Sequence, residues 1–307
     1  MTSTTVEKPS WAFAEGEEIA PGRHALELLG GGTLYEAYIA NDDHLGALVV
    51  VKLLRPGLVR DPKALRAIHA EADMLAGLAH PYLVRSFGVD LDRGRPQLVL
   101  EHLEGLRLST LLRRYGLILE QLLPLALDLS SVLGYLAREG VVHLDVKPRN
   151  VVMGDRPRLI DLSVARRVDE LDALTGPVGT DAYMAPEQCD PALFGDIGPA
   201  SDMWGLGVTL YEALTGSRPF ERPGVRFPQL FEVAPPLDAR APAPLKEAVT
   251  ALLEPRPGDR PTADQLADVV QPLADELPPP RIGRFRPRAK ALMRDVQFDM
   301  TSERRKR

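Results

Sequence analysis

The stretch Val142-His143-Leu144-Asp145-Val146-Lys147-Pro148-Arg149-Asn150-Val151-Val152 decides the fold of this chain. It places a carboxylate, an ammonium and a carboxamide within six residues, between apolar runs that are typical of short buried strands. Sixteen residues after Asp145, a second carboxylate, Asp161, follows the apolar pair Leu159-Ile160. Polar residues of these types at this spacing indicate a reaction centre rather than an ordinary loop.

Two features upstream point to the same chemistry. Gly30, Gly31 and Gly32 lie between two β-type runs, where glycines let backbone amides approach phosphates without side-chain collisions. A plain turn is the alternative for such a cluster. Lys52 lies in the third β-type run, and Glu71 lies 19 residues later on a predicted helix, so the two are candidates for an ion pair.

Hydrophobic periodicity predicts a β-rich first part and a helical second part. The predicted strands span residues 24–29, 34–40, 47–54, 84–89 and 97–103, and Asp61-Pro62 should open a helix among them. The predicted helices of the second part span residues 108–115, 120–139, 202–215, 244–253 and 262–273. The pattern indicates a small β-rich lobe followed by a larger helical lobe.

These motifs resemble those of protein kinases, above all the bacterial Ser/Thr kinases of the eukaryotic-like type. Residues 179–187 look like the end of a kinase activation segment, and residues 201–208 look like the start of the central helix of the large lobe. The resemblance covers about residues 24–275 and implies a bilobal α+β fold. The expected division is a flexible lead (1–20), a small lobe (21–103), a large lobe (104–277) and a basic tail that begins with prolines (278–307).

The resemblance also implies a role for each candidate residue. Asp145 would receive the proton of the substrate hydroxyl, Lys147 would neutralise the transferred phosphate, and Lys52, held by Glu71, would bind the phosphates of ATP. The expected ligands of Mg²⁺ (or Mn²⁺) are Asn150 and Asp161. The expected contacts to ATP are Gly30, Gly31, Gly32, Ala37, Val50, Lys52, Leu100, Glu101, Leu103 and Val152.

By the same resemblance, five further residues have expected roles. Asp202 would anchor the backbone of the catalytic loop, and Arg260 would form a buried ion pair with Glu187. Thr180 would hydrogen-bond to Lys147 and Asp145, and Thr175 would be the phosphorylation site of the activation segment. Lys147 itself, two residues after Asp145, marks specificity for Ser/Thr rather than Tyr.

The implied function is transfer of the ATP γ-phosphate to Ser/Thr hydroxyls of proteins, including this chain itself. Four departures from the family keep a pseudokinase, a regulatory binding module with weak or no catalysis, as an alternative. They are Tyr35 in place of the third loop glycine, Val50 in place of alanine, Leu144 in place of arginine, and Leu162-Ser163 in place of Phe-Gly. A small-molecule phosphotransferase is a further alternative, which Ala185-Pro186-Glu187 counts against.

Composition narrows the setting. The single cysteine, Cys189, cannot form an internal disulfide, which favours a reducing, cytoplasmic location. No run of 18 apolar residues is present. Residues 281–307 hold ten Lys/Arg against three Asp/Glu, so the rest of the chain is acidic and is not expected to bind nucleic acid. The tail is expected to be solvated, and an acidic partner or a membrane surface remain open as its contacts.

Overall fold

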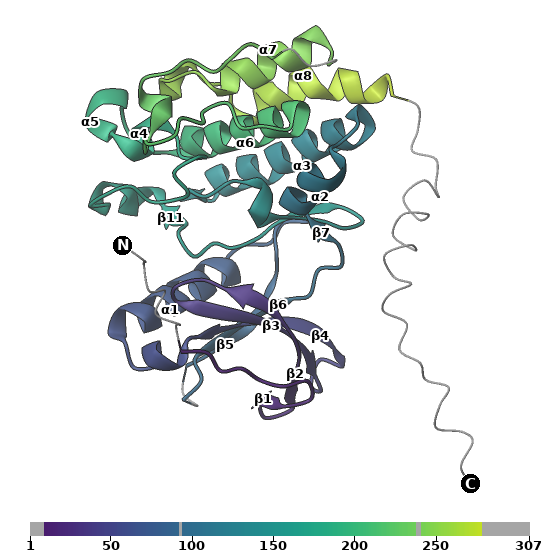
Figure 1. Cartoon of the computed structure of the whole chain (residues 1–307), viewed down its shortest axis with the longest axis vertical. Coiled ribbons are helices and arrows are strands. Elements are labelled where there is room, and N and C mark those ends of the chain that lie inside the picture. The colour runs from purple at the N-terminus through teal and green to yellow at the C-terminus, as the bar shows by residue number, and fades with distance from the viewer. Residues whose placement is uncertain (1–8, 92–93, 238–240, 278–307) are drawn as a thin grey trace.

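The structure is a computed structural model that describes residues 9–91, 94–237 and 241–277. It has a β-rich lobe with one long helix and a second lobe built mainly of helices (Figure 1). The strands are β1 (Glu18–Ala20), β2 (Arg23–Gly31), β3 (Tyr35–Asp42), β4 (Ala47–Leu54), β5 (Ser86–Asp90), β6 (Gln97–Glu101), β7 (Leu106–Arg107), β8 (Val141–Val142), β9 (Val151–Met153), β10 (Pro157–Leu159) and β11 (Arg166–Arg167). The α-helices are α1 (Pro62–Ala76), α2 (Leu108–Tyr115), α3 (Leu119–Arg138), α4 (Pro186–Cys189), α5 (Pro191–Phe194), α6 (Pro199–Thr215), α7 (Ala243–Leu252) and α8 (Ala263–Asp275). The 3₁₀ helices are η1 (Pro56–Leu58), η2 (Pro148–Asn150), η3 (Val168–Ala173), η4 (Pro228–Leu230) and η5 (Pro257–Asp259).

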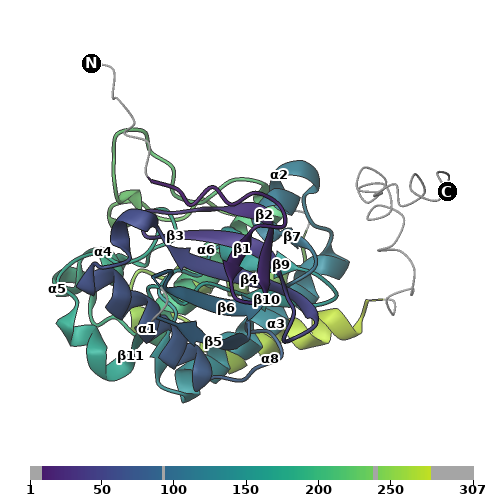
Figure 2. The ribbon, with the colours of Figure 1, turned by 90° about the horizontal axis from the view of Figure 1, so that it is seen from below.

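The first lobe is an antiparallel sheet with the strand order β1-β2-β3-β4-β6-β5, and α1 runs beside it (Figure 2). Successive residues of a strand face opposite sides, so each strand contributes to two cores. Val49 and Val51 of β4 belong to the core on the outer face, whereas Val50 packs against the core that continues into the helical lobe. Lys52 shares the face of Val50, and it therefore points toward α1.

The outer face of this sheet is covered by the segment expected to be a flexible lead. That expectation is wrong for residues 9–20. Ile19 in β1 is buried, and Trp11 and Phe13 pack against the outer core. The indole Nε1 of Trp11 donates a hydrogen bond to the Leu54 carbonyl at 2.8 Å. The physical reason is that the sheet exposes an apolar face, which this aromatic pair removes from water.

Local signals in the sequence fix several helix ends. The Asp61 side chain accepts hydrogen bonds from the backbone amides of Lys63 and Ala64, which makes it the N-cap of α1, as the Asp61-Pro62 pair predicts. Gly216 ends α6 in the left-handed conformation, which glycine adopts without a Cβ penalty. The core of the second lobe is formed mainly by the buried faces of α3 and α6, with α7 and α8 packed against them.

Predicted and observed elements agree in type and order, and most boundaries differ by one to three residues. Within the described part of the chain, no helix is both long enough and apolar enough to cross a membrane. The proposed basic tail, 278–307, lies outside the described residues, and so do its suggested contacts.

Candidate active site

The catalytic loop follows β8 and is anchored from the large lobe. The backbone amides of His143 and Leu144 donate to the two carboxylate oxygens of Asp202 in α6, at 2.7 and 2.8 Å. Leu144 has φ = +64°, in the left-handed region that costs a branched residue free energy. The buried Asp202 carboxylate holds this turn in place, which confirms the predicted anchor.

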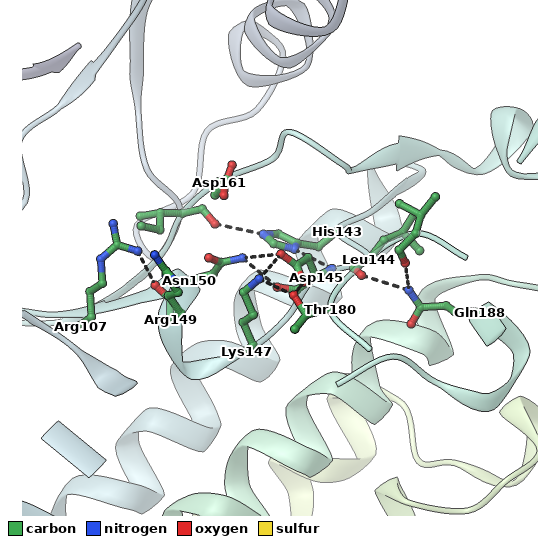
Figure 3. A network of polar contacts seen from close by, with 12 residues as sticks. Arg107, His143, Leu144, Asp145, Lys147, Arg149, Asn150, Asp161, Thr180 and Gln188 are labelled. Atoms are coloured by element: carbon green, nitrogen blue, oxygen red, sulfur yellow. Dashed lines mark hydrogen bonds and ion pairs between the residues drawn. The ribbon is translucent and has the colours of Figure 1, made fainter. Parts of the chain in front are cut away.

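Asp145 is the centre of a compact polar network (Figure 3). Its Oδ2 accepts a hydrogen bond from Lys147 Nζ at 2.6 Å and one from Asn150 Nδ2 at 3.0 Å. Its Oδ1 accepts a hydrogen bond from the Thr180 hydroxyl at 2.7 Å, and Lys147 also donates to that hydroxyl. The predicted hydrogen bonds of Thr180 to Lys147 and Asp145 are confirmed, and they link the activation segment to the catalytic loop.

A second charged cluster joins the two lobes. Lys52 Nζ lies 2.9 and 2.8 Å from the two carboxylate oxygens of Glu71 in α1, and 2.9 Å from Oδ1 of Asp161. Burial alone would raise the pKa of Asp161, but the Lys52 ammonium outweighs it and holds that pKa below its usual value. Burial likewise opposes the charge of Lys52, and the two carboxylates reverse this effect and raise its pKa. Lys52 and Asp161 therefore stay ionised, whereas burial raises the pKa of Glu71 above its usual value.

Two side chains supply oxygen atoms suited to a hard divalent cation. Asn150 uses its amide NH₂ to bond the Asp145 side chain and carbonyl, which leaves its Oδ1 available. Asp161 uses one oxygen for Lys52, and its backbone adopts φ = +68°. A carboxylate and a carboxamide oxygen match the ligand preference of Mg²⁺, which completes its shell with water and phosphate. The residues present thus fit the metal.

The residues expected around ATP come from both lobes. Ala37 pairs with Lys52, and Val50 pairs with Leu100, across neighbouring strands of the small lobe. Val152 lies in β9 of the large lobe. Glu101 ends β6, and Leu103 lies just beyond it. Gly30 and Gly31 end β2, and Gly32 follows in the turn to β3.

The glycine loop is held closely by its own backbone. The Gly32 amide donates to the Tyr35 carbonyl at 2.9 Å. A Cβ atom on Gly31 would lie 2.5 Å from that same carbonyl oxygen, so only glycine fits there. Arg55 Nε donates to the Gly32 carbonyl at 2.9 Å, a support that the sequence did not reveal because arginine at a strand end is normally solvated.

Tyr35, which stands in place of the third loop glycine of the family, lies in the core and not at the surface. β3 begins at Tyr35, which turns the ring inward, and the side chain is 8% exposed. Lys52 Nζ lies 4.6 Å from the ring centroid, a favourable cation–π distance. Burial raises the pKa of Tyr35 to about 12, although Lys52 lowers it, so the hydroxyl stays protonated. Tyr35 is therefore part of the core beneath the loop.

This position predicts opposite effects for two substitutions of Tyr35. Tyr35→Phe keeps the ring and removes a hydroxyl that has no hydrogen-bond partner among the described residues, so it should raise the free energy of unfolding by about 1 kcal/mol. Tyr35→Gly should lower it by roughly 3–5 kcal/mol, because a buried aromatic ring is lost. Urea unfolding measures both, and a Tyr35→Gly protein as stable as the wild type would place the ring outside the core.

An apolar cluster holds the activation segment against the catalytic loop. Leu144, in the position where the family carries arginine, is 3% exposed and packs with Val142 of β8 and Leu171 of η3. Leu174 and Val178 of the activation segment pack against the same cluster. The segment is thus held by hydrophobic contact at the place where a charged side chain would bind a phosphate.

Gln188 is a second supporting residue that the sequence did not reveal. Its Nε2 donates to the Leu144 carbonyl at 3.0 Å and to the Val178 carbonyl at 2.9 Å, while its Oε1 accepts from the Ala185 amide. The side chain therefore links the catalytic loop to the activation segment.

Its neighbour Cys189 has a pKa that burial raises to about 12, so its thiol is not an activated nucleophile.

The geometry defines the class of the protein. The chain belongs to the protein kinase family: residues 23–270 match the protein kinase domain. It is similar to bacterial serine/threonine-protein kinases in particular. It is 34% identical to PknA of Mycobacterium tuberculosis, over 87% of this chain and 66% of PknA. It is 31% identical to a probable PknB of Bifidobacterium longum, over 73% of this chain and 35% of that protein.

A third relative, the probable serine/threonine-protein kinase SCO3848 of Streptomyces coelicolor, is 33% identical over 65% of this chain and 31% of its own length. The chain thus spans less than two thirds of the length of these relatives. Each of the three is named a kinase. The six candidate catalytic and metal-binding residues all lie in the two clusters described above: Lys52, Glu71, Asp145, Lys147, Asn150 and Asp161. The pseudokinase alternative gains no support.

Proposed function

We propose that this chain transfers the γ-phosphate of ATP to serine and threonine hydroxyls of proteins, including its own. The observation that carries the proposal is the joint presence of the Lys52–Glu71–Asp161 cluster and the network around Asp145. Phosphoryl transfer depends on alignment and charge neutralisation more than on covalent chemistry, and these two clusters supply both.

In this reaction, Asp145 orients the substrate hydroxyl and takes its proton, and Lys147 neutralises charge that develops on the transferred group. Lys52 holds the phosphates of ATP, while Val50 and Val152 contact the base from the small-lobe and large-lobe sides. Asn150 and Asp161 would hold Mg²⁺, which neutralises phosphate charge when bound. We propose Mg²⁺ as the physiological ion and expect Mn²⁺ to substitute for it.

The direct test is incubation of the purified chain with γ-labelled ATP and either Mg²⁺ or Mn²⁺, followed by phosphoamino-acid analysis. We expect label on phosphoserine and phosphothreonine, and loss of the label when the metal is chelated. Label confined to phosphotyrosine would contradict the proposed specificity. ATP turnover without any protein label would indicate a small-molecule phosphotransferase or an ATPase.

Phosphorylation of the activation segment is expected to have a modest effect. Thr175 is exposed, whereas the segment around it is already held by the apolar cluster of Leu144 and Leu171. Thr175→Ala should therefore change kcat by less than tenfold, as measured by initial rates of peptide phosphorylation. A larger loss, beyond about 1.4 kcal/mol of barrier, would show that phosphate binds elsewhere. The candidates are Arg166 and Arg167, which line the same hollow of about 860 Å³ as Thr175.

A further inference from the structure

Two arginines lie together beside the catalytic residues without a carboxylate partner. Arg107, the last residue of β7, donates from Nη1 to the backbone carbonyl of Arg149 at 2.9 Å. Arg149 belongs to η2, directly before Asn150, and its side chain is exposed. Among the residues that the structure describes, neither guanidinium forms an ion pair.

The missing carboxylate matters most at Arg107, because its side chain is half-buried. Some arginines elsewhere in the large lobe do form ion pairs, such as Arg260 with Glu187 and Arg226 with Asp181. Burial and the neighbouring charge of Arg149 lower the pKa of Arg107, and only Asp161 opposes them. Asp161 is already bonded to Lys52. Two positive charges are therefore held close together. A bound anion would stabilise this arrangement.

The position of the pair relates it to a protein substrate. Asp145 lies between the pair on one side and Thr180 and Gln188 on the other (Figure 3). A polypeptide whose hydroxyl reaches Asp145 extends past the residue on both sides. One flank then meets the end of the activation segment, and the other flank meets the arginines. An extended chain advances about 3.3 Å per residue, so a side chain a few positions from the acceptor can reach them.

We infer that Arg107 and Arg149 form a subsite for an acidic residue of the protein substrate, a few positions from the phosphorylated Ser or Thr. This inference rests on the proposed kinase function. Arginine binds carboxylates and phosphates through two parallel hydrogen bonds, so Asp, Glu or a phosphorylated residue fits. The bond from Arg107 to the Arg149 carbonyl fixes the first guanidinium before the substrate arrives, which reduces the entropy lost on binding.

The test is a set of peptides with one threonine in a neutral background and a single Glu, Gln or Lys at each position from four before to four after it. We expect kcat/KM to be about tenfold higher for Glu than for Gln at one or two positions on one flank, and lowest for Lys. Arg107→Gln with Arg149→Gln should equalise Glu and Gln, and Arg149→Glu should favour Lys. Arg114→Gln, an exposed arginine at the end of α2, should keep the wild-type preference.

Two results would overturn the inference: equal kcat/KM for Glu and Gln peptides in the wild type, or a double variant that raises the KM for ATP without changing peptide preference. The second result would assign the arginines to the nucleotide. Thermal unfolding of each variant separates lost recognition from lost folding.

A measurement of peptide binding tests the subsite independently of the proposed kinase function. Fluorescence anisotropy with labelled Glu and Gln peptides, a non-hydrolysable ATP analogue and Mg²⁺ needs no turnover. Tighter binding of the Glu peptide without phosphate transfer would refute the kinase function and support the subsite. Phosphate transfer with equal affinities and equal rates for the Glu and Gln peptides would support the kinase function and refute the subsite.

Discussion

Asp145→Asn is expected to lower kcat for phosphate transfer by a factor of about 10²–10⁴, the usual contribution of a positioned base. An amide cannot accept the hydroxyl proton. In the wild type, Thr180, Lys147 and Asn150 all donate hydrogen bonds to the Asp145 carboxylate. In the variant, the amide NH₂ group replaces one carboxylate oxygen, so it must face at least one of these donors. Initial rates at saturating ATP and peptide measure the effect, which corresponds to roughly 3–5 kcal/mol of barrier.

The control for this experiment is stability. Asp145 is only partly buried and its network also rests on Thr180 and Asn150, so the unfolding midpoint of Asp145→Asn should stay near that of the wild type. Equal phosphate incorporation by the two proteins would show that Asp145 is not the base. A large fall in stability would show instead that the carboxylate is mainly structural.

Arg260→Ala is expected to lower the free energy of unfolding strongly. Arg260 and Glu187 form two hydrogen bonds of 2.7 Å, and both side chains are fully buried. Arg260 also donates to the carbonyls of Glu254, Ala200 and Pro255. Removing one partner of a buried pair leaves an uncompensated charge, which typically costs about 3–5 kcal/mol. Urea unfolding followed by circular dichroism measures this loss.

A matched control is available in the same lobe. Arg226 pairs with Asp181 at 2.9 Å, but both side chains are largely exposed, so Arg226→Ala should leave the free energy of unfolding nearly unchanged. Replacing both members of the buried pair, with Arg260→Met and Glu187→Leu, should recover part of the loss, because no charge is then left without a partner. Equal losses of unfolding free energy for Arg260→Ala and Arg226→Ala would refute the argument that burial sets the cost of breaking the ion pair.

The sequence alone determined the centre of the site. Asp145, Lys147 and Asn150 lie within six residues, and so short a loop between buried strands leaves them little freedom to separate. The register of alternating residues likewise placed Val50 and Lys52 on one face of their strand. The pairs Lys52–Glu71 and Glu187–Arg260 were predicted through the resemblance to protein kinases, and the structure confirms their contacts.

Tertiary structure alone decided the features that depend on contacts between segments far apart in the sequence. Tyr35 is buried because the register of β3 pairs it with Leu54, and a one-residue slip of this register would turn the ring outward. Trp11 and Phe13 are ordered because a sheet formed later in the chain offers them an apolar face. Arg107 and Arg149, 42 residues apart, meet because β7 pairs with β9. The local sequence around each of these residues could not predict the contacts, because packing between distant segments creates them.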